Sequence, residues 1–284
     1  KPSVMSIELL LFYYSVAIVV ASLVGGWLPS LIKLKHTQTQ ILMSFVAGLM
    51  LGVAFYHLLP HAIHMAGSEH AVDNAVWWLM AGLLFMFVLL RLFHFHQHDP
   101  VELNQSLDHD HCHGDDHASA HKLVHSLSWV GISFGLALHT LSDGVALGAS
   151  VQTDALENAP VVLSGFGVFV AIVLHKPLDA MSISALMQAS GWNLKSRVLM
   201  NLVFATMCPI GAYLFLIGAG QFGDMQNIIV ANTLAFSAGV FICISLSDLL
   251  PEIQFHSHDK LNLTVALFLG VFAAYGIGFL EASH

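Results

Sequence analysis

The stretch LHTLSDGVALG, residues 138–148, places His139 and Asp143 four positions apart inside a long apolar segment. On an α-helix this spacing puts both side chains on one face. The same spacing returns one apolar segment later in HKPLD, residues 175–179. An ionisable side chain at the centre of a membrane-spanning helix costs about 2.5–3.5 kcal/mol or more, so such residues are retained mainly for function. The two pairs therefore mark a candidate functional site.

The rest of the chain has the composition of a membrane protein. Of its 284 residues, 56% are hydrophobic and only 10% are charged, and the mean hydropathy is +0.74. Soluble domains carry about 25% charged residues. Apolar runs long enough to cross a bilayer are expected at residues 7–32, 38–63, 74–93, 126–151, 160–188, 196–220, 226–250 and 261–281. We therefore predict an all-α polytopic protein with one transmembrane domain over residues 1–284.

Basic residues fall in alternate connections between these runs. They are Lys33, Lys35, Arg91, Lys122, Lys195, Arg197 and Lys260. Because cytoplasmic loops of membrane proteins are enriched in Lys and Arg, this side is expected to face the cytoplasm, with both termini outside. We expect a multi-pass protein of a plasma membrane, and specifically of a bacterial inner membrane.

The second and seventh runs share a short echo. The second contains HLLPH at residues 57–61 and the seventh contains DLLPE at residues 248–252. The two runs cross the membrane in opposite directions, which predicts inverted repeats, with runs one to three and six to eight flanking the middle pair. The polar residues near the echo form an outer set, His57, His61 and His64, and an inner set, Asp248, Glu252, His256 and His258. These are either relays through which metal enters and leaves, or ordinary helix-end polarity.

Residues 94–125 form a His- and Asp-rich connection, which we expect on the cytoplasmic side. Its candidate metal ligands are His94, His96, His98, His109, His111, Cys112, His113, His117 and His121. Such a composition binds metal without a fixed geometry. We expect a metal buffer or sensor, with a solvated connector as the alternative.

Together, the two His-x-x-x-Asp pairs have the composition of a metal site. Two imidazole nitrogens and two carboxylate oxygens satisfy a tetrahedral divalent ion, and the ion neutralises the two negative charges. The alternative is an interhelical hydrogen bond. Imidazole favours borderline metals over hard ones, which leaves Zn²⁺, Cd²⁺, Fe²⁺ and Mn²⁺ open as the ion that the site binds. The bilayer is the other expected partner, and a homodimer is left open. We expect no nucleic acid and no organic cofactor.

Three further residues of the motifs are expected to modulate the site: Lys176, Thr140 and Ser142. An ammonium group on Lys176 can bond Asp143 or Asp179 and supply the positive charge that a second ion would bring; otherwise Lys176 is a structural cation. Pro177 frees a backbone carbonyl and is expected to kink its helix.

At residues 139–148 and 175–179 the chain resembles the ZIP (Zrt/Irt-like) metal transporters. The resemblance implies eight spans, both termini outside, a His-rich loop between spans three and four, and a metal site between spans four and five. It implies that His139, Asp143, His175 and Asp179 are the transport ligands. It also implies that the substrate is Zn²⁺ or a similar ion, which moves into the cytoplasm by an elevator-like movement.

The chain departs from the family pattern in three places. The family often has Asn at the position of Thr140 and an acid at that of Lys176, and its proline usually lies one position after Pro177. The first two departures predict one tightly held metal, and the third allows a one-residue shift at Asp179. A cation-diffusion-type exporter is the runner-up, and a channel or metal receptor is a third possibility. An enzyme is not expected, because the metalloprotease motif His-Glu-x-x-His is absent.

Overall fold

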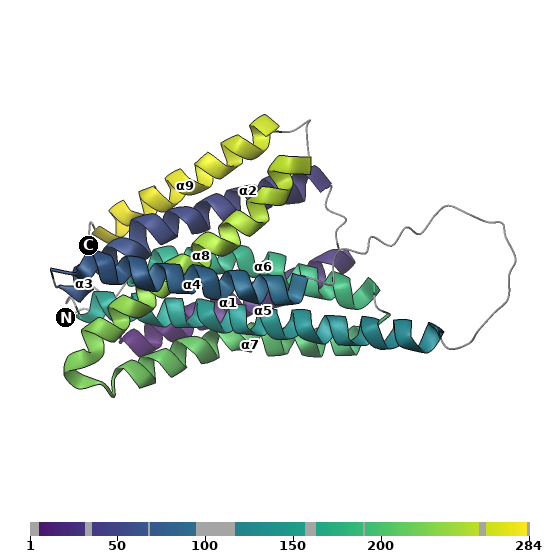
Figure 1. Ribbon diagram of the computed structural model, residues 1–284, viewed down its shortest axis with the longest axis horizontal. Coiled ribbons are helices and arrows are strands. Elements are labelled where there is room, and N and C mark those ends of the chain that lie inside the picture. Colours follow the sequence, from purple (N-terminus) through teal and green to yellow (C-terminus); the bar gives the residue numbers. More distant parts are fainter. Residues whose placement is uncertain are drawn as a thin grey trace, which may run out of the picture.

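The computed structural model describes residues 6–31, 36–67, 69–94, 117–156, 163–189, 191–255 and 260–282. These residues are almost entirely helical and contain eight helices long and apolar enough to cross a membrane. The prediction of an eight-span, all-α protein is therefore confirmed. The long helices run side by side along one common direction (Figure 1).

The helices follow the predicted runs closely in most cases. They are α1 (Ile7–Leu31), α2 (His36–Val53), α3 (Leu59–Ala66), α4 (Ala71–His94), α5 (His117–Leu156), α6 (Phe166–Ala189), α7 (Leu194–Ala219), α8 (Gln226–Phe255) and α9 (Lys260–Ala282). The predicted second run is built from α2, the π-helical turn η1 (Ala54–Leu58) and α3 together. A short 3₁₀ turn, η3 (Gly223–Met225), leads into α8.

The two largest differences between predicted and observed boundaries lie at the beginnings of α5 and α6. Helix α5 begins at His117, so residues 117–125, expected in the connection, are helical. A helix of 40 residues is about 60 Å long at 1.5 Å per residue, twice the thickness of a bilayer core. Figure 1 accordingly shows α5 extending past its neighbours. Helix α6 begins at Phe166 rather than at residue 160, because Gly165 has a φ of 66°, which ends a right-handed helix.

The break inside the second span lies at the echo motif. Pro60 lacks a backbone N–H, and its ring crowds the preceding turn of a regular helix. The chain meets this with the wider turn η1, in which the N–H of Leu59 donates to the carbonyl of Ala54. Such π turns are frequent at functional sites. Here the turn carries His57 into the protein interior, where it is buried.

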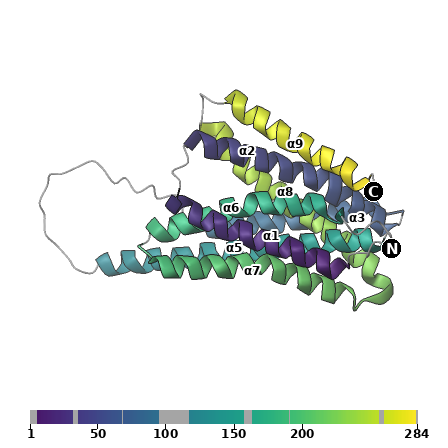
Figure 2. The ribbon, with the colours of Figure 1, turned by 180° about the vertical axis from the view of Figure 1, so that it is seen from behind.

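The helices form two bundles. Helices α1, α5, α6 and α7 contact one another, with α5 against α7 and α1 against α6 as the main interfaces. Helices α2, α3, α4, α8 and α9 form the second bundle, with α2 against α9 and α4 against α8. Both views place α2 and α9 on one side of the molecule and α5 and α7 on the other, with α8 crossing obliquely between them (Figures 1 and 2). The bundles meet where α5 and α6 contact α8 and α2.

This pattern of contacts has the symmetry of an inverted repeat. Exchanging α1 with α7, α2 with α8, α4 with α9 and α5 with α6 turns each main interface into another main interface. The exchanged helices run in opposite directions, because an even number of spans, four or none, lies between the members of each pair. The predicted inverted repeat therefore has a structural counterpart.

Close packing of glycines shows the same repeat at the level of single residues. A methyl group on Gly48 of α2 would overlap the carbonyl oxygen of Leu267, and one on Gly239 of α8 would overlap that of Leu79. In the same two interfaces, Gly270 faces the carbonyl of Phe45 and Gly82 faces that of Phe236. Small residues allow membrane helices to approach this closely. Under the exchange of helices, Gly48 corresponds to Gly239 and Gly270 to Gly82. Their contacts correspond as well, Leu267 to Leu79 and Phe45 to Phe236, and this agreement of residue types fixes the register of the repeat.

Candidate metal centre

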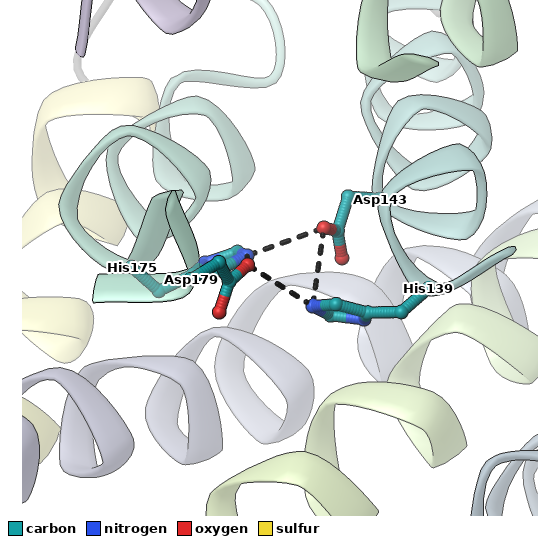
Figure 3. Close-up of side chains that lie close together, drawn as sticks. All are labelled: His139, Asp143, His175 and Asp179. Carbon is teal, nitrogen blue, oxygen red and sulfur yellow. Dashed lines mark hydrogen bonds and ion pairs between the residues drawn. The ribbon is translucent and has the colours of Figure 1, made fainter. Parts of the chain in front are cut away.

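The four residues of the two sequence pairs converge in the structure. His139 and Asp143 project from α5, and His175 and Asp179 project from α6 (Figure 3). One ligand atom from each residue can be chosen so that all four atoms lie within 4.8 Å of one another. The i,i+4 spacing does this because each pair occupies one helix face, and the two faces oppose each other.

The spacing of these atoms suits a small divalent ion. The distance from His139 Nε2 is 3.5 Å to Asp143 Oδ2 and 3.4 Å to Asp179 Oδ2. From His175 Nε2 the corresponding distances are 3.2 Å and 3.8 Å. Zinc bonds of about 2.0–2.1 Å in a tetrahedron separate neighbouring ligand atoms by about 3.3 Å. The four nitrogen–oxygen distances lie near that value, and the other two pairs of ligand atoms lie within 4.8 Å, so the cluster can close around a tetrahedral metal ion.

The ring of His175 is oriented by its own helix. Its Nδ1 lies 2.7 Å from the carbonyl oxygen of Ala171. A carbonyl only accepts, so Nδ1 carries the proton, and a neutral ring then has its lone pair on Nε2. That lone pair faces the negatively charged Asp143 Oδ2. The two groups repel each other, and a cation between them would stabilise the arrangement. The ring of Phe241 on α8 packs edge-on against His175, with centroids 6.4 Å apart.

The same cluster contains a basic side chain. The Lys176 ammonium donates to Asp143 Oδ2 at 2.5 Å, to Asp179 Oδ2 at 3.2 Å and to Thr140 Oγ1 at 3.2 Å. Lys176 thus makes the contacts expected of it, and its role as a modulator of a metal site stays a prediction. Asp143 Oδ1 and His139 Nδ1 are buried and have no hydrogen-bond partner among the described residues.

Burial differs across the site. Asp143 is fully buried, and His139, His175 and Lys176 are nearly so, whereas 25% of the Asp179 side chain is exposed. A buried charge is tolerated when it is paired and hydrogen-bonded. With neutral imidazoles, two carboxylates and one ammonium leave a formal charge of −1, so the centre still attracts a cation.

Sequence reasoning missed three contributors to this centre. The Ala171 carbonyl could have been found, since it lies one helical turn before His175, but Phe241 comes from a distant helix with no motif. The third is Cys208 on α7, which is buried and whose carbonyl oxygen lies against Gly144, the residue after Asp143.

Other predicted residues lie elsewhere. The Ser142 hydroxyl donates to the carbonyl of Leu138 on its own helix at 2.9 Å. Pro177 lies inside α6, which continues to Ala189. His57 is buried, and its Nε2 lies 2.8 Å from the Ala274 carbonyl on α9.

The rest of the outer set and the inner set lie outside the cluster or outside the described residues. His61 is half-buried and His64 is exposed. Asp248 and Glu252 belong to α8, but their side chains are outside the description, as are His256 and His258 entirely. In the His-rich tract, three of the predicted ligands lie in helices but are described without their side chains: His94, His117 and His121. The others lie outside the described residues: His96, His98, His109, His111, Cys112 and His113.

Comparison with known proteins relates this chain to a protein family. The family described as ZIP Zinc transporter matches residues 8–126 and 94–278. The chain is 25% identical to the zinc transporter ZIP9-B of Xenopus laevis over 281 residues, which covers 87% of this chain and 86% of the relative. It is 26% identical to zinc transporter ZIP9 of Micropogonias undulatus over 284 residues, covering 86% and 85%.

A plant protein is also similar. Zinc transporter 3 of Arabidopsis thaliana is 24% identical over 250 residues, covering 80% of this chain and 70% of the relative. These relatives are eukaryotic, so they give no support to the expected bacterial inner membrane. The eight apolar helices make this a multi-pass membrane protein, and the family match over nearly the whole chain shows that it belongs to the ZIP zinc transporter family.

Proposed function

We propose that this protein carries Zn²⁺, or a similar borderline divalent metal, across a membrane into the cytoplasm. His139, Asp143, His175 and Asp179 would hold the ion during its passage. The observation that carries the proposal is the convergence of two imidazoles and two carboxylates, with spacings of 3.2–3.8 Å, inside an eight-span protein. Relatives named as zinc transporters support Zn²⁺ as the substrate.

Burial of the site supports a pathway that opens toward the cytoplasm in this conformation. Asp179 is the partly exposed ligand, and it lies nearer the end of α6 that leads to the basic residues Lys195 and Arg197. By the positive-inside rule this end is cytoplasmic. Toward the other end of the helices, Leu147 and Ile172 are fully buried. An ion at the centre would therefore leave past Asp179.

The division into two bundles supports a moving-bundle mechanism. All four ligands belong to α5 and α6, within the bundle of α1, α5, α6 and α7. The other bundle contributes Phe241 as a neighbour but none of the four ligands. Sliding one bundle against the other would carry the intact site between the two membrane faces, which is an elevator-type transport mechanism.

The transport proposal is tested in proteoliposomes that contain the full chain. Zn²⁺ should enter through the face opposite Lys195, and the His175→Ala variant should lose uptake while remaining monodisperse. The Lys195→Gln variant, changed at an exposed residue outside the site, should retain it. Uptake by folded His175→Ala at the normal rate would contradict the site, and transport only toward the opposite face would favour an exporter. Ion flux at channel rates would favour the channel alternative.

The moving-bundle mechanism is tested at a contact between the bundles. A Cβ at Gly167 of α6 would lie 2.9 Å from Nδ1 and 3.2 Å from Cγ of His57 in η1, so cysteines at the two positions face each other and a short bifunctional thiol reagent can join them. Cross-linking of the His57→Cys, Gly167→Cys double variant should stop uptake, and a reductant should restore it. Each single variant serves as the control. Full transport by the cross-linked protein would rule out relative movement of the two bundles at this contact.

A further inference from the structure

The Lys176 ammonium occupies a built position beside the proposed metal centre. It is 2% exposed and donates to three oxygens, Asp143 Oδ2, Asp179 Oδ2 and Thr140 Oγ1. The two carboxylate oxygens are the same atoms that face the imidazole nitrogens. A metal ion and the ammonium group would therefore share one pair of ligands.

The inverted repeat explains why this position exists. Lys176 follows His175 as Thr140 follows His139, so the two residues are equivalent in the exchange of α5 with α6. They meet across the centre of the repeat, where Lys176 Nζ lies 3.2 Å from Thr140 Oγ1. The repeat thus builds a second polar position next to the four ligands, and the chain fills it with a covalently attached cation.

From these contacts we infer that Lys176 is a tethered counter-ion that limits the centre to one metal ion and keeps its affinity low enough for release. This inference rests on the proposed function. When no metal is bound, the ammonium offsets one of the two carboxylate charges. When a metal binds Asp143 Oδ2, the ammonium can stay on the same carboxylate, because Asp143 Oδ1 is buried and has no hydrogen-bond partner among the described residues. Asp143 then bridges the metal and Lys176.

Coulomb repulsion gives the consequence for binding and transport. A fixed positive charge a few ångströms from a divalent ion raises the free energy of the bound state, and more strongly where burial lowers the dielectric. It opposes a second dication at the Thr140 side and speeds dissociation of the first. Lys176 touches the ligands rather than the ion, so it is a positioning residue. Its removal should tighten binding and slow turnover, whereas damage to packing would weaken binding.

The test measures Zn²⁺ binding and uptake by the full-length protein in lipid nanodiscs and proteoliposomes. For each variant, the number of bound Zn²⁺ ions is compared with the number bound by the same variant carrying His175→Ala in addition, so that ions bound elsewhere on the chain are subtracted. By this difference, the wild-type protein should hold one tightly bound ion at the centre. Lys176→Gln should bind Zn²⁺ at least about tenfold more tightly, with KM and kcat for uptake both lowered. Lys176→Glu should bind a second ion, and Lys176→Arg should return both the stoichiometry and the affinity toward wild type.

The outcomes separate this inference from the proposed function. Weaker or unchanged affinity in folded Lys176→Gln, or a single ion in Lys176→Glu, would overturn the tethered counter-ion. If the Gln variant does not fold, Lys176→Met removes the charge and keeps a long side chain, and the same affinity criterion applies. Lys195→Gln makes the same charge change at an exposed residue and should leave affinity unchanged. Should His175→Ala leave the tight ion of wild type in place, the metal site itself would be wrongly assigned.

Discussion

Two regions of this molecule carry polar residues four positions apart on inverted helices. Among the side chains that the structure describes, only those on α5 and α6 form a cluster. On α5 and α6 the pairs His139–Asp143 and His175–Asp179 meet. In the second region, His57 is buried against the Ala274 carbonyl, and His61 and His64 are not part of the cluster. The sequence pattern of spacing is alike in the two regions, so spacing alone does not make a site.

The difference follows from where each pair lies relative to the centre of the repeat. An inverted repeat relates a position near one membrane face to a position near the opposite face, whereas positions at mid-depth are related to each other at the same depth. The pairs on α5 and α6 lie at mid-depth and converge. HLLPH lies in the C-terminal half of its span and DLLPE in the C-terminal half of α8, and the two spans run in opposite directions. The repeat therefore holds the two motifs apart.

The largest effect should come from removing a carboxylate at the converging region. We expect Asp143→Ala to reduce Zn²⁺ uptake by at least about a hundredfold, because breaking a buried ion pair costs about 3–5 kcal/mol and one metal ligand is lost. Asp143→Asn, which keeps the shape, should be equally inactive. The measurement is initial uptake into proteoliposomes at matched protein content. Asp73→Asn, at an exposed acid of α4, is the control. Substantial uptake by Asp143→Asn would show that the carboxylates of the α5–α6 cluster are not essential for transport.

The next largest effect concerns the packing that the repeat imposes. A methyl group at Gly48 or Gly239 would overlap a backbone carbonyl on the neighbouring helix, and overpacking costs about 1–3 kcal/mol. The two Gly→Ala variants should lower the thermal midpoint by similar amounts, because the sites are equivalent. Gly218→Ala meets no atom within 4 Å and should not lower it. A large difference between Gly48→Ala and Gly239→Ala would show that the two halves of the repeat are not energetically equivalent.

A smaller effect is expected at the outer polar residues. If His61 and His64 form a relay through which metal enters, His61→Ala should raise KM and leave kcat nearly unchanged. The rise should be below about tenfold, since one weak ligand contributes less than about 1.4 kcal/mol. Uptake kinetics at several Zn²⁺ concentrations measure this. An inactive but folded His61→Ala protein would mean that this residue is as essential as those of the converging region.

The smallest effect on transport should come from the His-rich connection. Because α5 begins at His117, a deletion of residues 99–114 spares the helix. It should leave Zn²⁺ uptake of the same order and remove several weakly bound ions, measured by metal analysis after dialysis. Loss of uptake in a folded deletion variant would show that the connection belongs to the pathway.

Much of the fold could be read from the sequence. Bilayer thickness fixes the length of an apolar run, so the spans were predictable, and the i,i+4 pairs identified the residues that cluster. The N-terminal extension of α5 could not be predicted, because residues 117–125 are polar and protrude from the apolar span. The beginning of α6 was missed for a local reason, the left-handed conformation of Gly165.

By itself, the sequence determined which side chains could bind metal and that they lie on single helix faces, because helical periodicity is local. Only the tertiary structure decided that α5 and α6 oppose their polar faces, that Phe241 packs against His175, and that Lys176 bonds both carboxylates. These contacts depend on the crossing of helices distant in the chain. Close approach at small residues fixes the depth and rotation of each helix, and that register brings the ligands to the centre of the repeat.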